Sequence, residues 1–162
     1  MNWKVGQGFD IHRLVAGRPL MLGGIEIPFA RGLLGHSDGD AVLHAVCDAI
    51  LGAIGAGDIG THFPDSDEKY RGAASATFVS EVVRLMRERG FRVGNVDVTV
   101  FAEQPRLAPH LAAMRESVAG SLEIDTESVN IKAKTMEGLG AIGRGEAIAA
   151  ACVVLLIGQE GD

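Results

Sequence analysis

Segments with strand character and segments with helix character follow one another along this chain without the regular alternation of a βαβ fold. Alternating or apolar runs predict a hairpin that turns at Gly23-Gly24 and strands at residues 4–12, 93–102, 129–135 and 146–157. Apolar residues at helical spacing predict helices at residues 39–54, 75–90 and 109–122. This order predicts one α+β domain over residues 1–162, with a mixed or mostly antiparallel sheet and helices packed on one face.

The composition fits a folded, aliphatic chain. Hydrophobic residues make up 47% of the sequence and aromatic residues 5%. The net charge of −6 argues against nucleic-acid binding, which depends on clustered Lys and Arg. Cys47 and Cys152 lie in apolar segments, so we expect two buried free thiols. The N-terminus has no signal-peptide run and residues 147–157 are too short to span a bilayer, so we expect a cytoplasmic protein with no membrane partner.

The tripeptide Asp10-Ile11-His12 lies in the first predicted strand. Side chains alternate between the two faces of a strand, so Asp10 and His12 point to one face and Ile11 is expected to enter the core. A carboxylate and an imidazole side by side can hold a divalent metal. The tripeptide is common, however, and by itself it does not establish a metal site.

A third metal ligand is available on the first predicted helix. Asp40, His44 and Asp48 follow one another at intervals of four residues, which places them on one stripe of that helix. His44 together with the strand pair would make a three-ligand zinc site with one open position. Asp48 is expected either to orient the second ring nitrogen of His44 or to cap nearby backbone donors. Nothing in the spacing brings His44 to the strand, so an ordinary helix histidine remains the alternative.

Two segments have features that suit phosphate groups. His36-Ser37 lies just before a helix that Ser37-Asp38 can cap, where free N–H groups and the helix dipole favour anions. The strand end at residues 132–135 carries two Lys and one Thr, and a glycine-rich turn around Arg144 follows it. Neither segment matches a P-loop or a dinucleotide fingerprint. Each one alone is explained as well by a capped helix and an ordinary glycine turn.

In their order along residues 6–157, these segments resemble the 2-C-methyl-D-erythritol 2,4-cyclodiphosphate synthase family. The stretch His36-Ser37-Asp38-Gly39-Asp40 is the most specific part of this resemblance. The other matching segments are 8–12, 34–35, 43–44, 57–60, 63–67, 94–99, 104–107, 109–110, 132–135 and 143–146.

The resemblance implies an enzyme of the non-mevalonate route to isoprenoids. Its substrate would be 4-diphosphocytidyl-2-C-methyl-D-erythritol 2-phosphate, whose 2-phosphate attacks the β-phosphorus so that CMP leaves and a cyclic diphosphate forms. It also implies a homotrimer with active sites shared between neighbouring subunits. Two other functions stay open: a zinc-dependent phosphohydrolase that activates water, and a non-catalytic trimer that binds cytidine nucleotides.

The resemblance also implies roles for individual residues. Asp10, His12 and His44 would bind Zn²⁺, and Glu137 would hold Mg²⁺ or Mn²⁺ at the diphosphate. His36 and Thr135 would be catalytic. The residues expected at the substrate are Asp10, His12, His36, Ser37, Asp58, Gly60, Phe63, Asp65, Asp67, Ala102, Pro105, Arg106, Leu107, Ala108, Lys134, Thr135, Glu137 and Arg144.

The chain departs from the family pattern at two places. Lys134-Thr135-Met136-Glu137-Gly138 replaces a frequent Thr-Thr-Thr-Glu-Lys, although the Thr and Glu that matter are kept. Ala141 replaces a Phe that in many members lines a cavity on the trimer axis, where a prenyl diphosphate can bind. The second departure weakens the expectation of such a pocket here.

Overall fold

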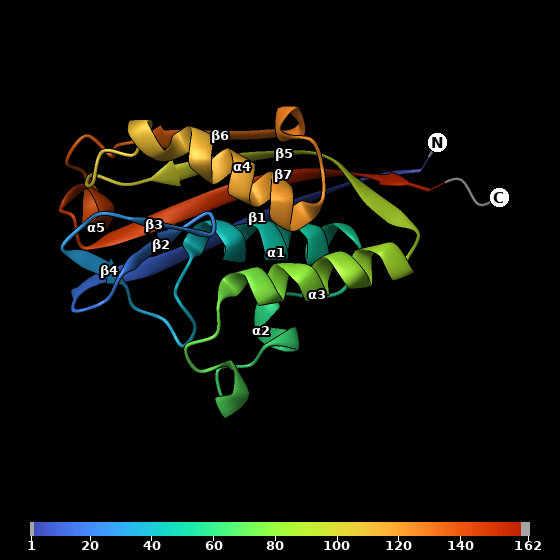
Figure 1. Ribbon diagram of the computed structural model, residues 1–162, viewed down its shortest axis with the longest axis horizontal. Helices are drawn as coiled ribbons and strands as arrows, with labels where there is room; N and C mark the ends of the chain where they lie inside the picture. Colours follow the sequence, from blue (N-terminus) through green and yellow to red (C-terminus); the bar gives the residue numbers. More distant parts are fainter. Residues whose placement is uncertain (1, 160–162) are drawn as a thin grey trace.

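A five-stranded mixed sheet forms the centre of the protein in the computed structural model, which describes residues 2–159 (Figure 1). Strands β1 (Trp3–Ala16), β4 (Arg31–Leu33), β5 (Phe91–Phe101), β6 (Val129–Lys134) and β7 (Ala147–Gly158) are arranged in the order β4-β1-β7-β5-β6. The β5–β6 pair is parallel, and the other neighbours are antiparallel. Strands β2 (Leu20–Leu22) and β3 (Ile25–Ile27) form a separate hairpin, as predicted.

The helices cover one face of the sheet (Figure 1). Helix α1 (Ala41–Ala53) packs on β1 and β7, and α3 (Ser75–Glu88) and α4 (Leu111–Leu122) flank it. Short helices α2 (Ile59–His62) and α5 (Gly140–Gly143) lie in connections, together with 3₁₀ turns at residues 68–70, 108–110 and 126–128. The predicted α+β fold, with a mixed sheet and helices on one face, is confirmed.

Two glycines allow β1 and α1 to pack against each other at backbone distance. A Cβ atom on Gly8 would lie 2.0 Å from the carbonyl oxygen of Ala45, and one on Gly6 would lie 1.8 Å from that of Ala49. Real Cβ atoms do not approach oxygen so closely, and these oxygens belong to the helix backbone. The absence of side chains at these two positions therefore fixes the distance between α1 and β1, the two elements that carry the predicted metal ligands.

Asp40 is the N-cap of α1 and is completely buried. Its carboxylate accepts hydrogen bonds from the N–H groups of Val42 and Leu43 in the first helical turn, and from those of Gly23 and Gly24 in the β2–β3 turn. A buried carboxylate needs such partners. One side chain thus caps the helix and fixes the hairpin to its start.

Several predicted boundaries differ from the structure. Strand β1 continues to Ala16, well beyond the predicted end at residue 12, because its last residues pair with β4, a strand that was not predicted. Helix α1 begins at Ala41 and is capped by Asp40, so the prediction that Ser37-Asp38 caps it is wrong. Helices α2 and α5 were not predicted.

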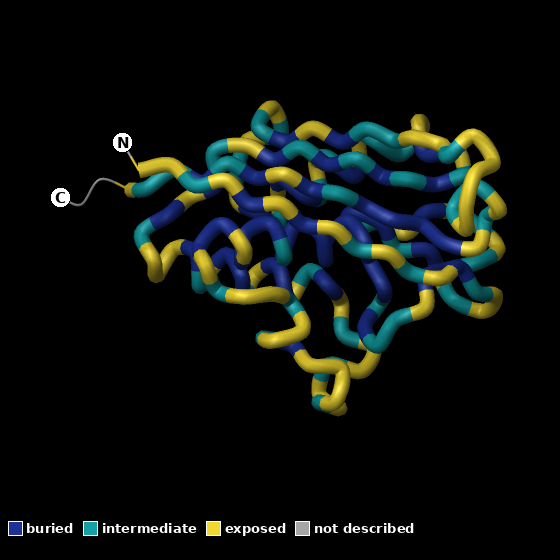
Figure 2. Tube along the Cα trace, turned by 180° about the vertical axis from the view of Figure 1, so that it is seen from behind, coloured by how far each residue is buried: buried dark blue, intermediate teal, exposed yellow. Residues whose placement is uncertain are grey.

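Within residues 2–159, the second face of the sheet carries no helix (Figure 1). Apolar side chains on this face are exposed in the single chain: Trp3, Val5, Phe9, Ile11 and Val153 are 46–68% exposed. The prediction that Ile11 enters the core is therefore wrong. Exposed and buried stretches alternate along the strands when the molecule is seen from behind (Figure 2).

Cys47 and Cys152 are buried free thiols, as predicted. Among residues 2–159, no helix is long and apolar enough to cross a membrane.

Candidate functional site

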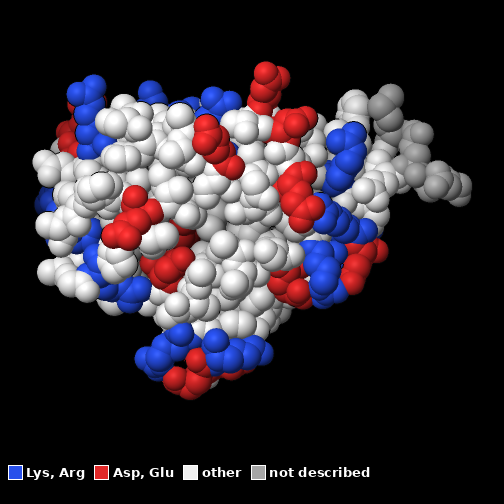
Figure 3. Space-filling view, in the orientation of Figure 1, with Lys and Arg blue, Asp and Glu red and all other residues white. Residues whose placement is uncertain are grey.

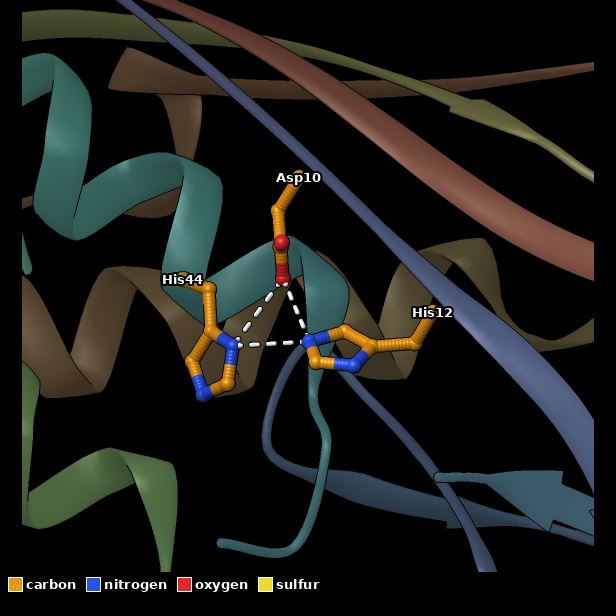
Figure 4. Close-up of side chains that lie close together, drawn as sticks. All are labelled: Asp10, His12 and His44. Carbon is orange, nitrogen blue, oxygen red and sulfur yellow. Dashed lines mark hydrogen bonds and ion pairs between the residues drawn. The ribbon is translucent and has the colours of Figure 1, made fainter. Parts of the chain in front are cut away.

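Asp10 and His12 on β1 and His44 on α1 point toward one another (Figure 4). Asp10 Oδ2 lies 2.8 Å from His12 Nε2 and 3.0 Å from His44 Nδ1, and the two ring nitrogens are 3.2 Å apart. Asp10 and His12 share a face because they are two residues apart on a strand. His44 reaches them because α1 packs closely on β1. The predicted three-ligand cluster is therefore present.

The outer nitrogen of each imidazole has its own hydrogen-bond acceptor. His12 Nδ1 lies 2.7 Å from the carbonyl oxygen of Leu34, which can only accept, so this nitrogen carries the proton. His44 Nε2 lies 2.8 Å from Ser75 Oγ. With both outer nitrogens protonated, both inner nitrogens present lone pairs toward the Asp10 carboxylate. Three electron-pair donors that face one another need a proton or a cation between them.

The three atoms fit a small divalent metal. Tetrahedral zinc with bonds of about 2.0–2.1 Å places its ligand atoms roughly 3.3 Å apart. The observed triangle, with sides of 2.8, 3.0 and 3.2 Å, needs to expand by only a few tenths of an ångström. One carboxylate and two neutral imidazoles are also ligands that zinc commonly takes in catalytic sites. The donor set therefore fits a divalent metal with room for a further ligand.

The pKa values of the cluster reflect the same attraction. Burial raises the pKa of Asp10, but its interactions with the rings of His12 and His44 outweigh burial, and the pKa ends well below its usual value. Burial lowers the pKa of His12, but its hydrogen bond and charge interaction with Asp10 raise it above the usual value. Without a metal, the His12 ring thus holds a second proton more tightly than in water, and Asp10 stays ionised beside it.

A cavity of about 470 Å³ opens beside the cluster. It is lined by the three candidate ligands and by five more of the predicted site residues: His36, Ser37, Gly60, Phe63 and Asp65. Asp58 caps α2 at the same cavity wall, and the carbonyl oxygen of Asp67 lies 3.4 Å from His36 Nε2. The structure thus brings the three candidate metal ligands and the predicted residues around them together at one cavity.

The segment formed by residues 63–72, which lies over this cavity, projects from the body of the protein. Its tip carries Lys, Arg, Asp and Glu side chains, which form ion pairs with one another (Figure 3). Its base is apolar: Phe63 stacks on Phe78 with ring centroids 4.6 Å apart, and Tyr70 meets both rings edge-on. These aromatic rings hold the segment against α3 beside His44.

The other predicted residues surround a different hollow. A cavity of about 220 Å³ is lined by Ala102, Pro105, Arg106, Leu107, Ala108, Lys134 and Thr135. Glu137 adjoins it, because Thr135 Oγ1 lies 3.2 Å from Glu137 Oε1. Arg144 does not line either hollow. It pairs with Glu146 beside α5.

Within one chain the two hollows lie on opposite sides of the sheet centre. The pairing Asp10–Ala150–Val100–Ala133 runs straight across β1, β7, β5 and β6, so the hollows lie at the same level of the sheet. Three strand spacings of about 4.8 Å separate β1 from β6 by roughly 14 Å. Helix α1 covers β1 and β7 between them, and none of the described residues lines both hollows.

Two predicted interactions are not found. Asp48 Oδ1 accepts a hydrogen bond from the N–H of Ile59 at 2.7 Å and does not contact His44, so it caps a neighbouring backbone donor and does not orient the ring. Burial raises the pKa of Asp48. The first-turn N–H groups of α1 are taken by Asp40 and are not free for an anion near His36-Ser37.

Sequence reasoning missed the groups that hold the two imidazoles. The Leu34 carbonyl lies 22 residues from His12, and Ser75 lies 31 residues from His44. The one sequence feature that pointed to Ser75 was its position at a helix start. Its contact with His44 depends on how α3 packs beside α1, and the local sequence pattern does not report this.

Comparison with known proteins agrees with this geometry. The sequence profile described as the YgbB family matches residues 3–157. The chain is 57% identical to the 2-C-methyl-D-erythritol 2,4-cyclodiphosphate synthase of Dechloromonas aromatica, over 96% of this chain and 98% of that protein. It is 54% identical to the bifunctional enzyme IspD/IspF of Albidiferax ferrireducens over 96% of this chain, and it spans 37% of that longer protein.

A solved structure shares the fold as well. The CDP complex of IspF from Plasmodium falciparum superposes with a TM-score of 0.87 and 35% identity, with 98% of each chain covered. The family profile covers nearly all of the described residues. This chain is therefore a member of the YgbB family, together with the enzymes named 2-C-methyl-D-erythritol 2,4-cyclodiphosphate synthase.

Proposed function

We propose that this chain converts 4-diphosphocytidyl-2-C-methyl-D-erythritol 2-phosphate to 2-C-methyl-D-erythritol 2,4-cyclodiphosphate in the non-mevalonate pathway. An oxygen of the 2-phosphate forms a bond to the β-phosphorus, and the bond from that phosphorus to the bridging oxygen breaks. CMP leaves with the bridging oxygen, and no water is consumed. The observation that carries the proposal is the convergence of three metal-ligand atoms beside a cavity in a chain of this family.

Asp10, His12 and His44 are proposed to hold Zn²⁺, and Glu137 is proposed to hold Mg²⁺ or Mn²⁺ at the diphosphate. Bound metal supplies positive charge to the diphosphate and polarises the phosphorus that is attacked. The acidic chain itself, with a net charge of −6, offers little positive charge for this purpose. We therefore expect bound cations to neutralise the negative charge of a substrate that carries three phosphates.

The remaining residues position the substrate. His36 and Ser37 line the cavity beside the candidate ligands, where they can contact the reacting phosphates. The Thr135 hydroxyl and the Lys134 ammonium group line the second hollow and suit the diphosphate from its other side. We assign His36 and Thr135 to stabilising charge on the transferred group, because positioning and electrostatics supply most of the catalysis in phosphoryl transfer.

The cytidine end of the substrate is assigned to two groups of residues. Asp58 Oδ1 is occupied by the N–H and the hydroxyl of Thr61, so its second oxygen and the backbone at Gly60 are assigned to the ribose. Ala102 and residues 105–108 form the mostly apolar wall of the smaller hollow, which suits a planar base. Phe63, Asp65 and Asp67 lie in the segment over the larger cavity and are assigned to the methylerythritol end, and Arg144 to phosphate.

We infer that the protein works as a homotrimer whose active sites lie between subunits. The helix-free face of the sheet exposes the apolar side chains of Trp3, Val5, Phe9, Ile11 and Val153 in the single chain. Such a face is expected to be covered, because antiparallel sheets that face water normally carry polar residues there. Association through this face can bring the larger hollow of one subunit to the smaller hollow of the next.

The masses of the products test this proposal. Purified protein with Zn²⁺ and Mg²⁺ is incubated with the substrate, and the products are identified by mass spectrometry. Cyclisation yields CMP and a cyclic diphosphate whose masses add up to that of the substrate. A phosphohydrolase yields a second product that is heavier by one water molecule. A non-catalytic nucleotide-binding protein binds CDP and leaves the substrate intact. Either of the last two results would overturn the proposal.

A further inference from the structure

The outer nitrogen of His44 lies in a buried group of hydroxyls. Ser75 Oγ lies 2.8 Å from His44 Nε2, and Ser37 Oγ lies 3.2 Å from the same nitrogen. Ser75 is 0% exposed, Ser37 5% and His44 9%. Both hydroxyls are therefore shielded from bulk water, and the direction of these hydrogen bonds is set by the protein groups around them.

The chain of hydrogen bonds continues from Ser75 to Asp38. Ser75 Oγ is hydrogen-bonded to Asp38 Oδ1, and the N–H of Ser75 donates to Asp38 Oδ2 at 2.9 Å. The N–H of Asp40 also donates to Asp38 Oδ1, at 3.1 Å. Asp38 thus holds Ser75 at two atoms and ties the start of α3 to the loop before α1.

The direction of these bonds follows from the groups involved. A carboxylate oxygen only accepts, so the Ser75 hydroxyl donates its proton to Asp38. The lone pairs of Ser75 Oγ are then left for His44, and His44 must donate from Nε2. This leaves the lone pair of His44 on Nδ1, the nitrogen that lies 3.0 Å from Asp10 Oδ2.

We propose that Asp38 and Ser75 are positioning residues for the metal centre, which fix His44 in the tautomer and ring orientation that bind a divalent metal. This inference rests on the proposed function, because it assigns residues that support the metal site of that function. Groups that hydrogen-bond the outer nitrogen of a metal-binding histidine fix its tautomer and raise its basicity. For His12 the same task falls to the Leu34 carbonyl, which substitution of a side chain cannot remove.

Two substitutions interrupt this chain of hydrogen bonds at different points. Ser75→Ala removes the nearer acceptor of His44 Nε2 and leaves only Ser37 Oγ, at 3.2 Å. Asp38→Asn replaces one acceptor oxygen by an NH₂ group, and neither orientation of the amide can accept all three hydrogen bonds. With the amide oxygen at the Oδ1 position, the NH₂ group faces the N–H of Ser75; in the other orientation it faces the Ser75 hydroxyl and the N–H of Asp40. If the NH₂ group faces the Ser75 hydroxyl, the hydroxyl turns its proton toward His44 Nε2 and favours the tautomer that cannot bind metal through Nδ1.

Two matched substitutions serve as controls. Ser80→Ala removes a hydroxyl from the same helix as Ser75, where it bonds only to the carbonyl oxygen of Ala76. Asp48→Asn makes the same change as Asp38→Asn on the helix of His44, and the amide oxygen of Asn can still accept from Ile59. Neither control side chain is hydrogen-bonded to the ring of His44.

The experiment measures Zn²⁺ affinity by competition with a chelator at one fixed pH, and the unfolding midpoint of the zinc-free proteins. Ser75→Ala and Asp38→Asn are expected to weaken Zn²⁺ binding by roughly 10–100-fold, and the two controls to leave it unchanged. In the zinc-loaded wild type, a ¹H–¹⁵N spectrum should show a ring N–H of His44 that exchanges slowly with water. This signal should be lost in Ser75→Ala, which a purely structural role of Ser75 would not require.

The outcomes separate a failure of this inference from a failure of the proposed metal centre. A folded Ser75→Ala or Asp38→Asn protein that binds Zn²⁺ as tightly as the wild type overturns the inference and leaves the proposed metal centre standing. A wild type that binds no Zn²⁺ overturns both. If one variant does not fold, the other decides by the same comparison.

Discussion

At the scale of single residues, the ability of the Asp10–His12–His44 cluster to bind a metal depends on which ring nitrogens carry protons. Each imidazole donates from its outer nitrogen, to the Leu34 carbonyl or to Ser75, and directs a lone pair toward the Asp10 carboxylate. In the metal-free chain a proton must occupy the centre of the cluster, which agrees with the raised pKa of His12. A divalent metal replaces this proton and satisfies all three ligand atoms together.

Replacement of His44 tests this reading. His44→Ala removes one of three ligand atoms and is expected to abolish stoichiometric Zn²⁺ binding, because the two remaining ligands hold zinc poorly. His62→Ala is the matched control, since His62 bonds to the carbonyl oxygen of Ala56 outside the cluster. Metal content per chain after dialysis is the measurement. Equal zinc content in His44→Ala and in the control would show that zinc binds elsewhere.

The thiol of Cys152 gives a prediction for pH. Burial raises the pKa of Cys152 to about 12, whereas an ordinary thiol ionises near about 8.5. The folded state therefore suppresses the reactive thiolate between these two values, and this thiol stabilises the fold below about 8.5 and progressively less above it. Alkylation of the native protein by iodoacetamide should stay slow from pH 7 to about pH 10 and become fast in denaturant. Rapid native alkylation near pH 9 would contradict the prediction.

The candidate site could be predicted in part from single residues. Asp10 and His12 were paired correctly, because strand periodicity places residues two apart on one face. His44 was assigned from the family resemblance and not from spacing, since the approach of α1 to β1 is a tertiary contact. Of the two roles expected for Asp48, the cap of a backbone donor is confirmed and the orientation of the His44 ring is wrong. Its carboxylate accepts from Ile59, and Ser75 from another helix lies at the outer nitrogen of His44.

At the scale of elements, the packing of α1 on β1 holds the cluster together. Gly6 and Gly8 point toward the helix from the same face of β1 as Asp10 and His12. Because they have no side chain, the helix backbone comes close enough for His44 to reach Asp10. Ile11 was predicted to lie in the core because it is apolar, but it lies on the helix-free face of β1. The buried face of this strand is made largely by glycines and polar ligands.

Gly8→Ala is expected to separate these elements. The added methyl group would lie 2.0 Å from the carbonyl oxygen of Ala45, and a backbone atom cannot turn aside as a flexible side chain can. We expect a loss of at least about 1–3 kcal/mol in the free energy of unfolding, together with weaker Zn²⁺ binding because His44 moves with the helix. Urea unfolding of the zinc-free protein and chelator competition measure the two effects.

Gly120→Ala provides the control for this substitution. Gly120 lies in α4, and a Cβ atom there would meet no atom within 4 Å. Alanine favours the helix over glycine, so this variant should be unchanged or more stable by up to about 1 kcal/mol. If Gly8→Ala behaved like Gly120→Ala, the close approach of β1 and α1 would not be what fixes the cluster.

At the scale of the whole molecule, one chain holds the predicted site residues in two separate hollows. The family resemblance named these residues but not their separation, because order along the chain does not report distance across a sheet. The apolar side chains on the helix-free face, among them Trp3, Phe9 and Ile11, are the second feature that a single chain leaves unexplained. Association through this face accounts for both, since it covers the apolar residues and lets hollows from adjacent subunits meet.

Complementation between two inactive variants tests this assembly. His44→Ala disables the metal-side hollow and Thr135→Ala disables the other hollow, so each homotrimer is expected to be inactive. If every site combines the metal side of one subunit with the Thr135 side of its neighbour, a mixed trimer of either composition regains one intact site in three. Variants unfolded together, refolded and separated as mixed trimers should then release CMP at about one third of the wild-type rate per trimer.

A second pair of variants gives the control that makes this result specific. His44→Ala and Asp10→Ala both disable the metal side, so a subunit with an intact metal side is absent from every mixed trimer of this pair. These mixtures should stay inactive, although they assemble and refold under the same conditions. Native mass spectrometry verifies that mixing has occurred in both experiments. Verified mixing of His44→Ala with Thr135→Ala and no recovered CMP release would mean that both hollows act within one chain, and the roughly 14 Å between β1 and β6 would then have to be spanned by the substrate itself.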